Sequence, residues 1–332
     1  MIVRLFVHQI EVTLRLPKEL AVVAAYIKRD YSNFLAPSSF IRNKIKLFVS
    51  TKPRARLPKH FWLRTAYSQS TGWKTKTIQV KPDHHIWIRG RDPYFAVLSV
   101  KTAAEAYESL DRLLLSAIGE QLDQNQIHRL HAFSFQAGES GMIFTGACGV
   151  GKSYLAAQAN WDPSARIFHD EITLIQDRKI LPLPIAISVE ERFKTAAWHH
   201  VIQRKNGGRK WRAPLAHPSL TATTANVLIL AKRSHGTKSV LRSASFLEKL
   251  NFVFATGLGI GQMQMAEFTF RADLFWQLPG IFLARAFSAF RLIMQAEVLS
   301  AEIPNHITWP IFKNWIQSSA TAAEMGLATL AH

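Results

Sequence analysis

The sequence predicts an α/β fold that is preceded by a smaller N-terminal α+β domain. A glycine-rich loop lies between a β-forming stretch at 141–145 and a helix-forming run at 153–159. An amphipathic helix at 103–123 separates this unit from an earlier β-rich region. A chain of 332 residues has room for about two domains. We therefore expect an α+β accessory domain over 1–125 and a larger α/β domain over 126–332.

The N-terminal region reads as alternating strands with two helices. Apolar residues alternate with polar ones at 3–7 and 12–16, which predicts two strands around Gln9. A helix is expected after Pro17 and before Pro37, because proline suits a helix start and disfavours helix just before it. The basic segment 42–64 and the stretch 65–100 are both expected to be β-rich, with strand-like pieces at 75–80, 85–90 and 94–100. The helix at 103–123 carries one apolar stripe, made of Ala106, Leu110, Leu113, Leu114, Ile118 and Leu122.

The second region begins with a strand, a turn and a strand over 129–146. Further along, the apolar and turn-forming residues predict a strand or hairpin at 165–177 and a buried strand at 226–231. We expect a short helix at 246–250 and a glycine loop after it. The remaining elements expected are a helix at 281–299, apolar nearly all round, and a strand followed by a closing helix within 306–316.

Residues 146–153 match the pattern G-x-x-x-x-G-K-[ST] through Gly146, Gly151, Lys152 and Ser153. Glycines let several backbone N–H groups point inward around a phosphate, and a helix that starts at the lysine adds its positive dipole end. An ordinary glycine-rich turn is the alternative, but the strand before the motif and the helix after it favour a phosphate-binding loop. The nucleotide-binding residues expected are Gly146, Ala147, Cys148, Gly149, Val150, Gly151, Lys152, Ser153 and Tyr154.

A nucleotide site of this kind needs a carboxylate for its metal ion, and Asp170 and Glu171 follow Lys152 by only eighteen and nineteen positions. That spacing leaves room for one short helix, one turn and one strand, so we expect the motif helix and the acidic strand to be neighbours. Taken alone, the two acids fit the start of a turn equally well. The phosphate loop shortly before them favours a role in the site.

These residues resemble the HPr serine kinase family and its shorter relatives. The resemblance covers about 129–190 and is carried by His131-Ala132, Gly141, the loop 146–153 and the pair Asp170-Glu171. It implies a PEP-carboxykinase-like P-loop core that uses ATP and Mg²⁺ to phosphorylate a serine hydroxyl of a protein or peptide. The chain departs from the family pattern at Cys148, at Glu171 and at Thr256, so a kinase without the reverse, phosphorylase reaction is expected.

The chemistry of phosphoryl transfer suggests a role for each residue, because it depends mainly on positioning and charge neutralisation. Lys152 is expected to reach the outer phosphates, and Ser153 to bind Mg²⁺. Asp170 is the expected base for the acceptor hydroxyl and Glu171 the expected metal contact, and these two roles can be exchanged. The resemblance also suggests a site role for His131, although a histidine at a strand edge is commonly structural.

The chain carries a formal net charge of +18, which is compatible with nucleic acid, an anionic membrane or an acidic acceptor. The cations concentrate at 42–64 and 204–212, where solvated loops are the preferred interpretation. No zinc-knuckle or helix-turn-helix pattern is evident, so nucleic acid is not the favoured partner.

No apolar run is long enough to span a membrane, no signal peptide is evident, and Cys148 is the single cysteine. A cytoplasmic protein is expected.

Several other residues have no clear assignment in the sequence. His128, His169, His199 and His200 lack the spacing of a metal site. Arg285 or Arg291 would suit a charge clamp, but neither is assigned that role. Two other functions remain as alternatives to the kinase: a nucleotide-binding regulatory protein without phosphotransfer, and a nucleic-acid-associated ATPase. The sequence leaves the phosphoacceptor and the oligomeric state open.

Overall fold

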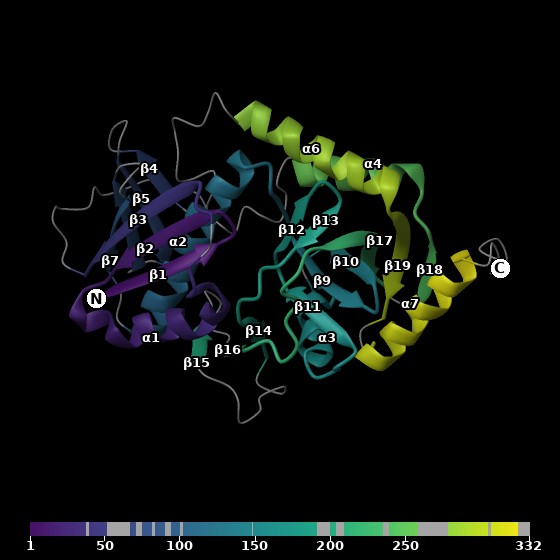
Figure 1. The fold of residues 1–332 in the computed structure, drawn as a ribbon, viewed down its shortest axis with the longest axis horizontal. Coiled ribbons are helices and arrows are strands. Elements are labelled where there is room, and N and C mark those ends of the chain that lie inside the picture. Colours follow the sequence, from purple (N-terminus) through teal and green to yellow (C-terminus); the bar gives the residue numbers. More distant parts are fainter. Residues whose placement is uncertain are drawn as a thin grey trace.

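The structure, a computed structural model, shows a mixed α/β protein with two large sheets and one small one (Figure 1). It describes residues 1–37, 40–51, 67–70, 75–81, 84–89, 94–99, 102–147, 149–190, 200–203, 209–234, 239–257, 278–304 and 307–324. None of the helices within these ranges is long and apolar enough to cross a bilayer.

The N-terminal sheet has seven strands in the order β1-β2-β3-β7-β6-β5-β4. The pairs β2–β3 and β3–β7 are parallel, and the remaining neighbours are antiparallel. Its strands are β1 (Ile2–Val7), β2 (Ile10–Arg15), β3 (Asn43–Ser50), β4 (Tyr67–Ser70), β5 (Thr75–Lys81), β6 (His84–Arg89) and β7 (Tyr94–Ser99). The inward residues of β1 to β3 pack against α1 (Ala21–Asp30) and α2 (Ala103–Gln124), as the period-two pattern and the apolar helix stripe predict. Two short 3₁₀ turns, η1 (Lys18–Leu20) and η2 (Ser32–Phe34), flank α1.

The second sheet has nine strands, with the order β11-β9-β10-β17-β13-β12-β8 along its main path. β19 pairs with β17, and β18 pairs with β19. Its strands are β8 (His128–Leu130), β9 (Ala132–Ala137), β10 (Ser140–Gly146), β11 (Ala165–His169), β12 (Thr173–Gln176), β13 (Lys179–Leu181), β17 (Thr223–Arg233), β18 (Val240–Ser243) and β19 (Glu297–Ile303). β17 is parallel to β10 and to β19, and the other pairs are antiparallel.

Helices cover both faces of this sheet. α3 (Lys152–Ala159) and α7 (Trp309–Glu324) pack on the face that contains Phe144 and Ile229. On the face of Ile143 and Leu228 pack α4 (Phe246–Gly257) and α6 (Leu278–Gln295), which form the upper layer in Figure 1. Successive residues of β10 and β17 thus enter opposite cores, which explains why both strands are apolar runs without alternation.

A small three-stranded sheet lies beside α2 and α3. Its strands β14 (Ile187–Val189), β16 (Arg209–Ala213) and β15 (His200–Gln203) are antiparallel, with β16 in the centre. β15 contacts α2 of the N-terminal region, and β14 contacts α3 of the second region. The small sheet therefore connects the two larger parts of the molecule.

The hydrophobic core of the N-terminal region is completed by residues from the second half of the chain. The N-terminal cluster that holds the inner faces of β1, β2 and α2 also contains five residues from in and around β12 and β13: Ile172, Leu174, Leu181, Leu183 and Ile185. Ala186 N–H donates to Asp30 O at 3.1 Å, and the Asn33 amide donates to Pro184 O at 2.8 Å. The division at residue 125 stays a prediction, and the two parts it separates share one core.

Three element predictions near the C-terminal end are wrong. The helix expected at 281–299 begins at Leu278 and ends at Gln295, and Val298 and Leu299 belong to β19. A run that is apolar nearly all round gives no periodicity that distinguishes helix from strand. The helix expected at 246–250 extends to Gly257, and residues 307–308 form no strand. Gly257, which was expected in a glycine loop, is the last residue of α4, and the rest of that predicted loop lies within 258–277, outside the described residues.

Candidate functional site

The loop 146–151 connects β10 to α3, so the expected order of strand, glycine-rich loop and helix is confirmed. Gly149 and Gly151 have φ values of +87° and +106°, a region that residues with a side chain rarely adopt. A Cβ on Gly146 would lie 2.2 Å from the carbonyl oxygen of Ala231 on the parallel strand β17. Glycine is therefore required at all three positions. Cys148 lies outside the described residues.

The side chain of Lys152 contacts the first two residues of the loop. Its side-chain Nζ donates hydrogen bonds to the carbonyl oxygens of Gly146 at 2.6 Å and of Ala147 at 3.3 Å. The residue is 7% exposed, which places a positive charge under the loop. Ser153 and Tyr154 follow in the first turn of α3 and are half-buried. The loop and the helix N-terminus therefore present positive charge and N–H dipoles at one place.

The sheet brings the other candidate residues to the same edge as the loop. β9 lies between β10 and β11 and is antiparallel to both. The C-terminal ends of β10 and β11 and the start of β9 therefore meet at one edge of the sheet. The loop follows β10, the pair Asp170-Glu171 follows β11, and His131 precedes β9. Residues that are about forty positions apart in the sequence thus gather around one point.

The pKa of His131 is shifted by the charged residues at this edge of the sheet. Burial lowers the pKa of His131, and the nearby charge of Lys152 lowers it further. Glu171 and Asp170 act in the opposite direction, with a smaller effect. A histidine with a lowered pKa is neutral near pH 7. The structure thus places His131 within electrostatic reach of all three charged candidates.

The two carboxylates differ in their access to solvent. Asp170 is 1% exposed, and its Oδ2 accepts a hydrogen bond from the backbone N–H of Ser188 on β14 at 3.3 Å. Glu171 is half-buried, and its carbonyl oxygen accepts from the N–H of Ala132 at 3.2 Å. β14 also contacts α3. The small sheet therefore borders the site on the side of Asp170.

His169, which had no sequence assignment, shapes the turn that carries the two acids. Its Nδ1 accepts hydrogen bonds from the N–H groups of Glu171 at 3.0 Å and Ile172 at 2.8 Å. Complete burial lowers its pKa to about 3, with a contribution from the charge of Arg212. The imidazole is therefore neutral with its proton on Nε2, and the 3.5 Å contact from Nδ1 to Asp170 Oδ1 is not an ion pair.

A buried polar cluster that the sequence did not predict lies behind Asp170, with Arg212 at its centre. Arg212 was expected in a solvated loop, but it lies on β16 and is 5% exposed. Its guanidinium donates to Ser188 Oγ at 3.0 Å, to Asp30 Oδ2 at 3.2 Å and to Asp111 Oδ2 at 3.3 Å. Tyr107 donates to Asp30, and Tyr31 donates to Asp111 Oδ1 at 2.8 Å. We call these six residues, Asp30, Tyr31, Tyr107, Asp111, Ser188 and Arg212, the Arg212 cluster.

The charged groups of the Arg212 cluster shift one another's pKa values. Burial lowers the pKa of Arg212, but Tyr107, Asp111 and Asp30 together raise it well above its ordinary value. Burial raises the pKa of Asp111, and the nearby guanidinium of Arg212 opposes that shift. The arginine is therefore charged, and the carboxylates of α1 and α2 stabilise its positive charge. The cluster joins the N-terminal helices to the strand that contacts Asp170.

Arg285 and Arg291 have structural partners. Arg285 is 1% exposed, and its Nε donates to Asp123 Oδ1 at 3.1 Å. Arg129 also donates to Asp123, at 3.0 Å. Arg291 pairs with Asp177 at 3.0 Å on the surface. The ion pairs with Asp123 and Asp177 thus account for the positions of both arginines without a role in phosphate binding.

The donor set at the sheet edge suits a hard cation. Magnesium prefers oxygen ligands and commonly takes only one or two protein carboxylates, with phosphate oxygens and water completing the shell. Ser153, Asp170 and Glu171 offer a hydroxyl and two carboxylates, so the residue types fit magnesium held together with a nucleotide. Within the described ranges, no three His, Cys, Asp or Glu side chains cluster as a metal site made by protein alone.

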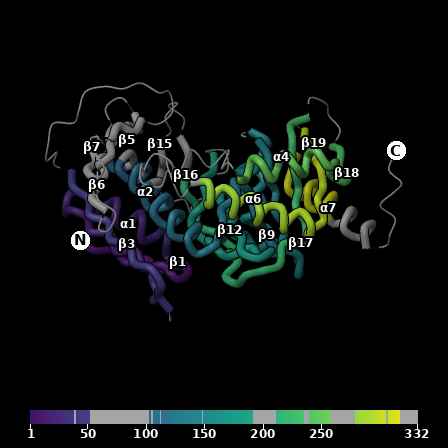
Figure 2. The backbone as a smooth tube through the Cα atoms, turned by 90° about the horizontal axis from the view of Figure 1, so that it is seen from above, coloured from purple at the N-terminus to yellow at the C-terminus, as the bar shows by residue number. Residues whose placement is uncertain are grey.

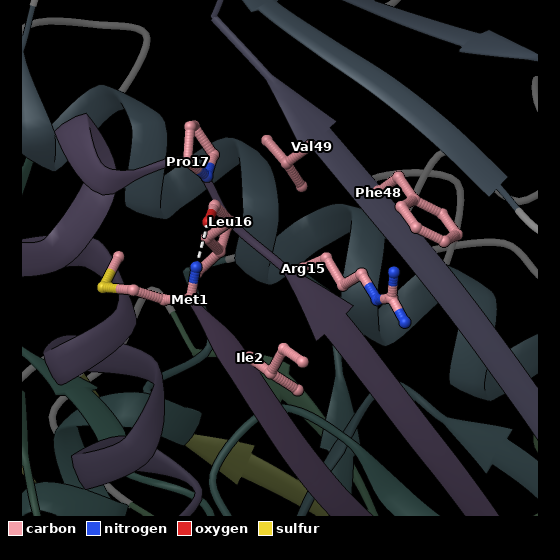
Figure 3. Close-up of a pocket in the computed structure, with 7 residues that line it drawn as sticks. All are labelled: Met1, Ile2, Arg15, Leu16, Pro17, Phe48 and Val49. Atoms are coloured by element: carbon pink, nitrogen blue, oxygen red, sulfur yellow. Dashed lines mark hydrogen bonds between the residues drawn. The ribbon is translucent and has the colours of Figure 1, made fainter.

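A shallow hollow of about 370 Å³ lies elsewhere, beside the start of β1 and the ends of β2 and β3 (Figure 3). The Met1 amine donates to Leu16 O at 2.6 Å beside it, and the Arg15 guanidinium lies 5.0 Å from the centre of the Phe48 ring. The lining residues are Met1, Ile2, Arg15, Leu16, Pro17, Phe48 and Val49. They offer no acid, base or nucleophile set, so we place the candidate site at the loop of β10 instead.

Comparison of the sequence with models of known protein families and with curated proteins gives no match.

Proposed function

We propose that this protein is an ATP-dependent, Mg²⁺-requiring kinase with a PEP-carboxykinase-like P-loop core, which phosphorylates a serine or threonine hydroxyl of a protein or peptide. The observation that carries the proposal is the meeting of the loop 146–153 and the pair Asp170-Glu171 at one sheet edge. The short interval between loop and acids, which underlies the family resemblance, adds support.

The proposed roles follow from charge and access. Lys152 and the N–H groups of the loop hold the outer phosphates, where negative charge is greatest. Ser153 and Glu171 contact the magnesium ion, since Glu171 is the more accessible of the two carboxylates. Asp170, which is protected from bulk water and oriented by Ser188, accepts the proton of the acceptor hydroxyl. His131 borders the site as a neutral group and orients the acceptor.

The proposed phosphate transfer requires no reactant other than ATP and the acceptor hydroxyl. The acceptor hydroxyl oxygen forms a bond to the γ-phosphorus, and the bond from that phosphorus to the β–γ bridging oxygen breaks. The hydroxyl proton passes to Asp170, and ADP leaves with the bridging oxygen. The net charge of +18 favours an acidic acceptor, because opposite charge increases the rate of encounter.

The test is phosphate transfer from γ-labelled ATP to a lysate or peptide pool of the native host. Wild type is compared with Lys152→Ala and Asp170→Asn, and Lys18→Ala, an exposed lysine of η1, serves as the control. Label that enters a protein or peptide with wild type and the control, but with neither site variant, supports the kinase.

Two other outcomes contradict the kinase and identify what replaces it. ATP binding that requires Lys152, without any label transfer, favours a regulatory nucleotide-binding protein. Nucleic acid that remains bound in high salt and stimulates ATP hydrolysis favours the nucleic-acid-associated ATPase, because simple electrostatic binding weakens steeply with salt.

A further inference from the structure

Helices α4 and α6 turn large apolar side chains toward solvent. Phe246 and Phe254 on α4 are 76% and 60% exposed, and Phe287 and Met294 on α6 are 61% and 67% exposed. We define the α4–α6 face by the eight exposed residues Phe246, Leu247, Leu250, Phe254, Leu283, Phe287, Phe290 and Met294. Single exposed apolar residues are common on proteins, but a set of eight on two adjacent helices is not.

The α4–α6 face is one continuous surface because the two helices pack side by side (Figures 1 and 2). A Cβ on Gly257 would lie 2.8 Å from the Cβ of Ala286, so the helices approach closely at this point. Their opposite sides are already used: Phe252, Ala289 and Leu292 are buried against the sheet. Among the residues that the structure describes, none buries the outward apolar side chains in a core.

The spacing of the exposed residues suits a second layer of helices. On α6 they follow at intervals of four, three and four from Leu283 to Met294, which is the 3.5-residue repeat of helices packed at a small angle. On α4, Phe246, Leu250 and Phe254 follow at intervals of four. Two such helix pairs facing each other make a four-helix bundle.

The size of the face matches what a stable dimer requires. Its four phenylalanines are between 48% and 76% exposed. At about 200 Å² for each ring, they alone expose roughly 500 Å². The two leucines of α4 and the leucine and methionine of α6 bring the area close to the ~800 Å² that each partner contributes to a standard interface.

The charges around the α4–α6 face disfavour an anionic membrane as its occupant. Helices that lie on such membranes carry rows of Lys and Arg beside their apolar side. Here Arg291 pairs with Asp177, Arg285 is buried against Asp123, and Glu248 is bound by Arg242 at 2.8 Å. Lys249 is the one other charged residue of the two helices. The face is therefore apolar and nearly neutral, although the whole chain is strongly basic.

We propose that the α4–α6 face is the interface of a homodimer, in which two copies pack α4 and α6 against α4 and α6 of the other. A twofold arrangement places the same apolar patch on both sides and closes the assembly at two copies. Because each chain carries a charge of +18, the two copies repel each other, and added salt strengthens the dimer.

The test is the mass of the full chain in solution, measured by sedimentation over a range of protein and salt concentrations. Wild type is expected at twice the mass of one chain, with tighter association at higher salt. Phe287→Glu on α6 and Phe254→Glu on α4 are each expected to weaken association at least 100-fold. Leu220→Glu is the control, because Leu220 is 62% exposed and lies outside the face. Circular dichroism checks that all variants are folded.

Three results would overturn the proposal. The first is a wild-type monomer at concentrations of tens of micromolar. The second is a dimer that both glutamate variants leave intact. The third is a monomer that binds vesicles of phosphatidylserine and phosphatidylcholine through the face, which would assign the face to a membrane. None of these measurements depends on the proposed kinase activity.

Discussion

Arg212 is linked to Asp170 by two hydrogen bonds through one residue, Ser188. The guanidinium donates to Ser188 Oγ at 3.0 Å, and the Ser188 N–H donates to Asp170 Oδ2 at 3.3 Å. The same arginine is held by Asp30 of α1 and Asp111 of α2. The position of a candidate catalytic carboxylate therefore depends on helices of the N-terminal region.

Replacing Arg212 with methionine is expected to destabilise the fold by about 3–5 kcal/mol, because two buried carboxylates lose their counter-charge. Urea unfolding measures this change, and Arg212→Lys should recover part of the loss. Arg291→Met is the control: its ion pair is exposed, and a change within about 1 kcal/mol is expected. Equal stabilities of Arg212→Met and wild type would contradict the described cluster.

Exchanging each carboxylate for its amide separates the roles of the two acids. If Asp170 is the base, Asp170→Asn lowers kcat by several powers of ten while the magnesium concentration for half-maximal rate stays unchanged. Glu171→Gln is then expected to raise that magnesium concentration. Steady-state rates over a magnesium series make the distinction, and the opposite pattern would exchange the two assignments.

Adding one methyl group at Gly146 is expected to disturb the loop. The new Cβ would lie 2.2 Å from the Ala231 carbonyl, so Gly146→Ala has to push β10 and β17 apart, at a cost of about 1–3 kcal/mol. Nucleotide affinity should fall with it. Gly280→Ala in the first turn of α6 meets nothing within 4 Å and serves as the control. Thermal unfolding with and without ATP measures both effects.

Acid is expected to destabilise the protein through His169. Its pKa is about 3 in the folded chain against an ordinary value of 6.5, so between these values the unfolded state holds a proton that the folded state does not. Stability therefore decreases as the pH falls below about 6.5, by up to about 1.4 kcal/mol per pH unit. His169→Asn keeps an acceptor for the two N–H groups and cannot titrate. Its stability should depend less on pH between 4 and 6.5, and an unchanged pH dependence would refute this origin.

A fragment of residues 126–332 is expected to fold poorly. Deleting the first 125 residues removes the partners of Leu174, Leu181 and Ile185, and it leaves Arg212 without Asp30 and Asp111. Circular dichroism and ATP binding of the fragment make the test. A folded fragment that binds ATP as the full chain does would show that the N-terminal region is a separable accessory domain.

The loop, its helix and the acid pair were predictable because each depends on residues that are close in the sequence. The glycines, Lys152 and the following helix formers lie within fourteen positions, and one helix and one strand lead to Asp170. The Arg212 cluster was not predictable in this way. Its partners lie 101 and 182 residues before Arg212, and nothing in a run of basic residues distinguishes the one that is buried.

The boundary between α6 and β19 was missed for another physical reason. Residues 281–299 are apolar nearly all round because α6 is largely apolar both toward the sheet and toward solvent, while β19 is buried on both faces. Neither glycine nor proline marks the change at Ala296. Periodicity therefore fails where a segment has no polar side.

The core shared between the two halves has a consequence for synthesis on the ribosome. The inner faces of β1, β2 and α2 are covered in part by residues 172–185, which emerge only after the glycine-rich loop has been made. Translation proceeds at about 5–20 residues per second, so several seconds pass between synthesis of α2 and synthesis of the last residues of this core. The nascent chain thus exposes apolar surface over that interval, and its first half is a natural client for chaperones that bind near the exit tunnel.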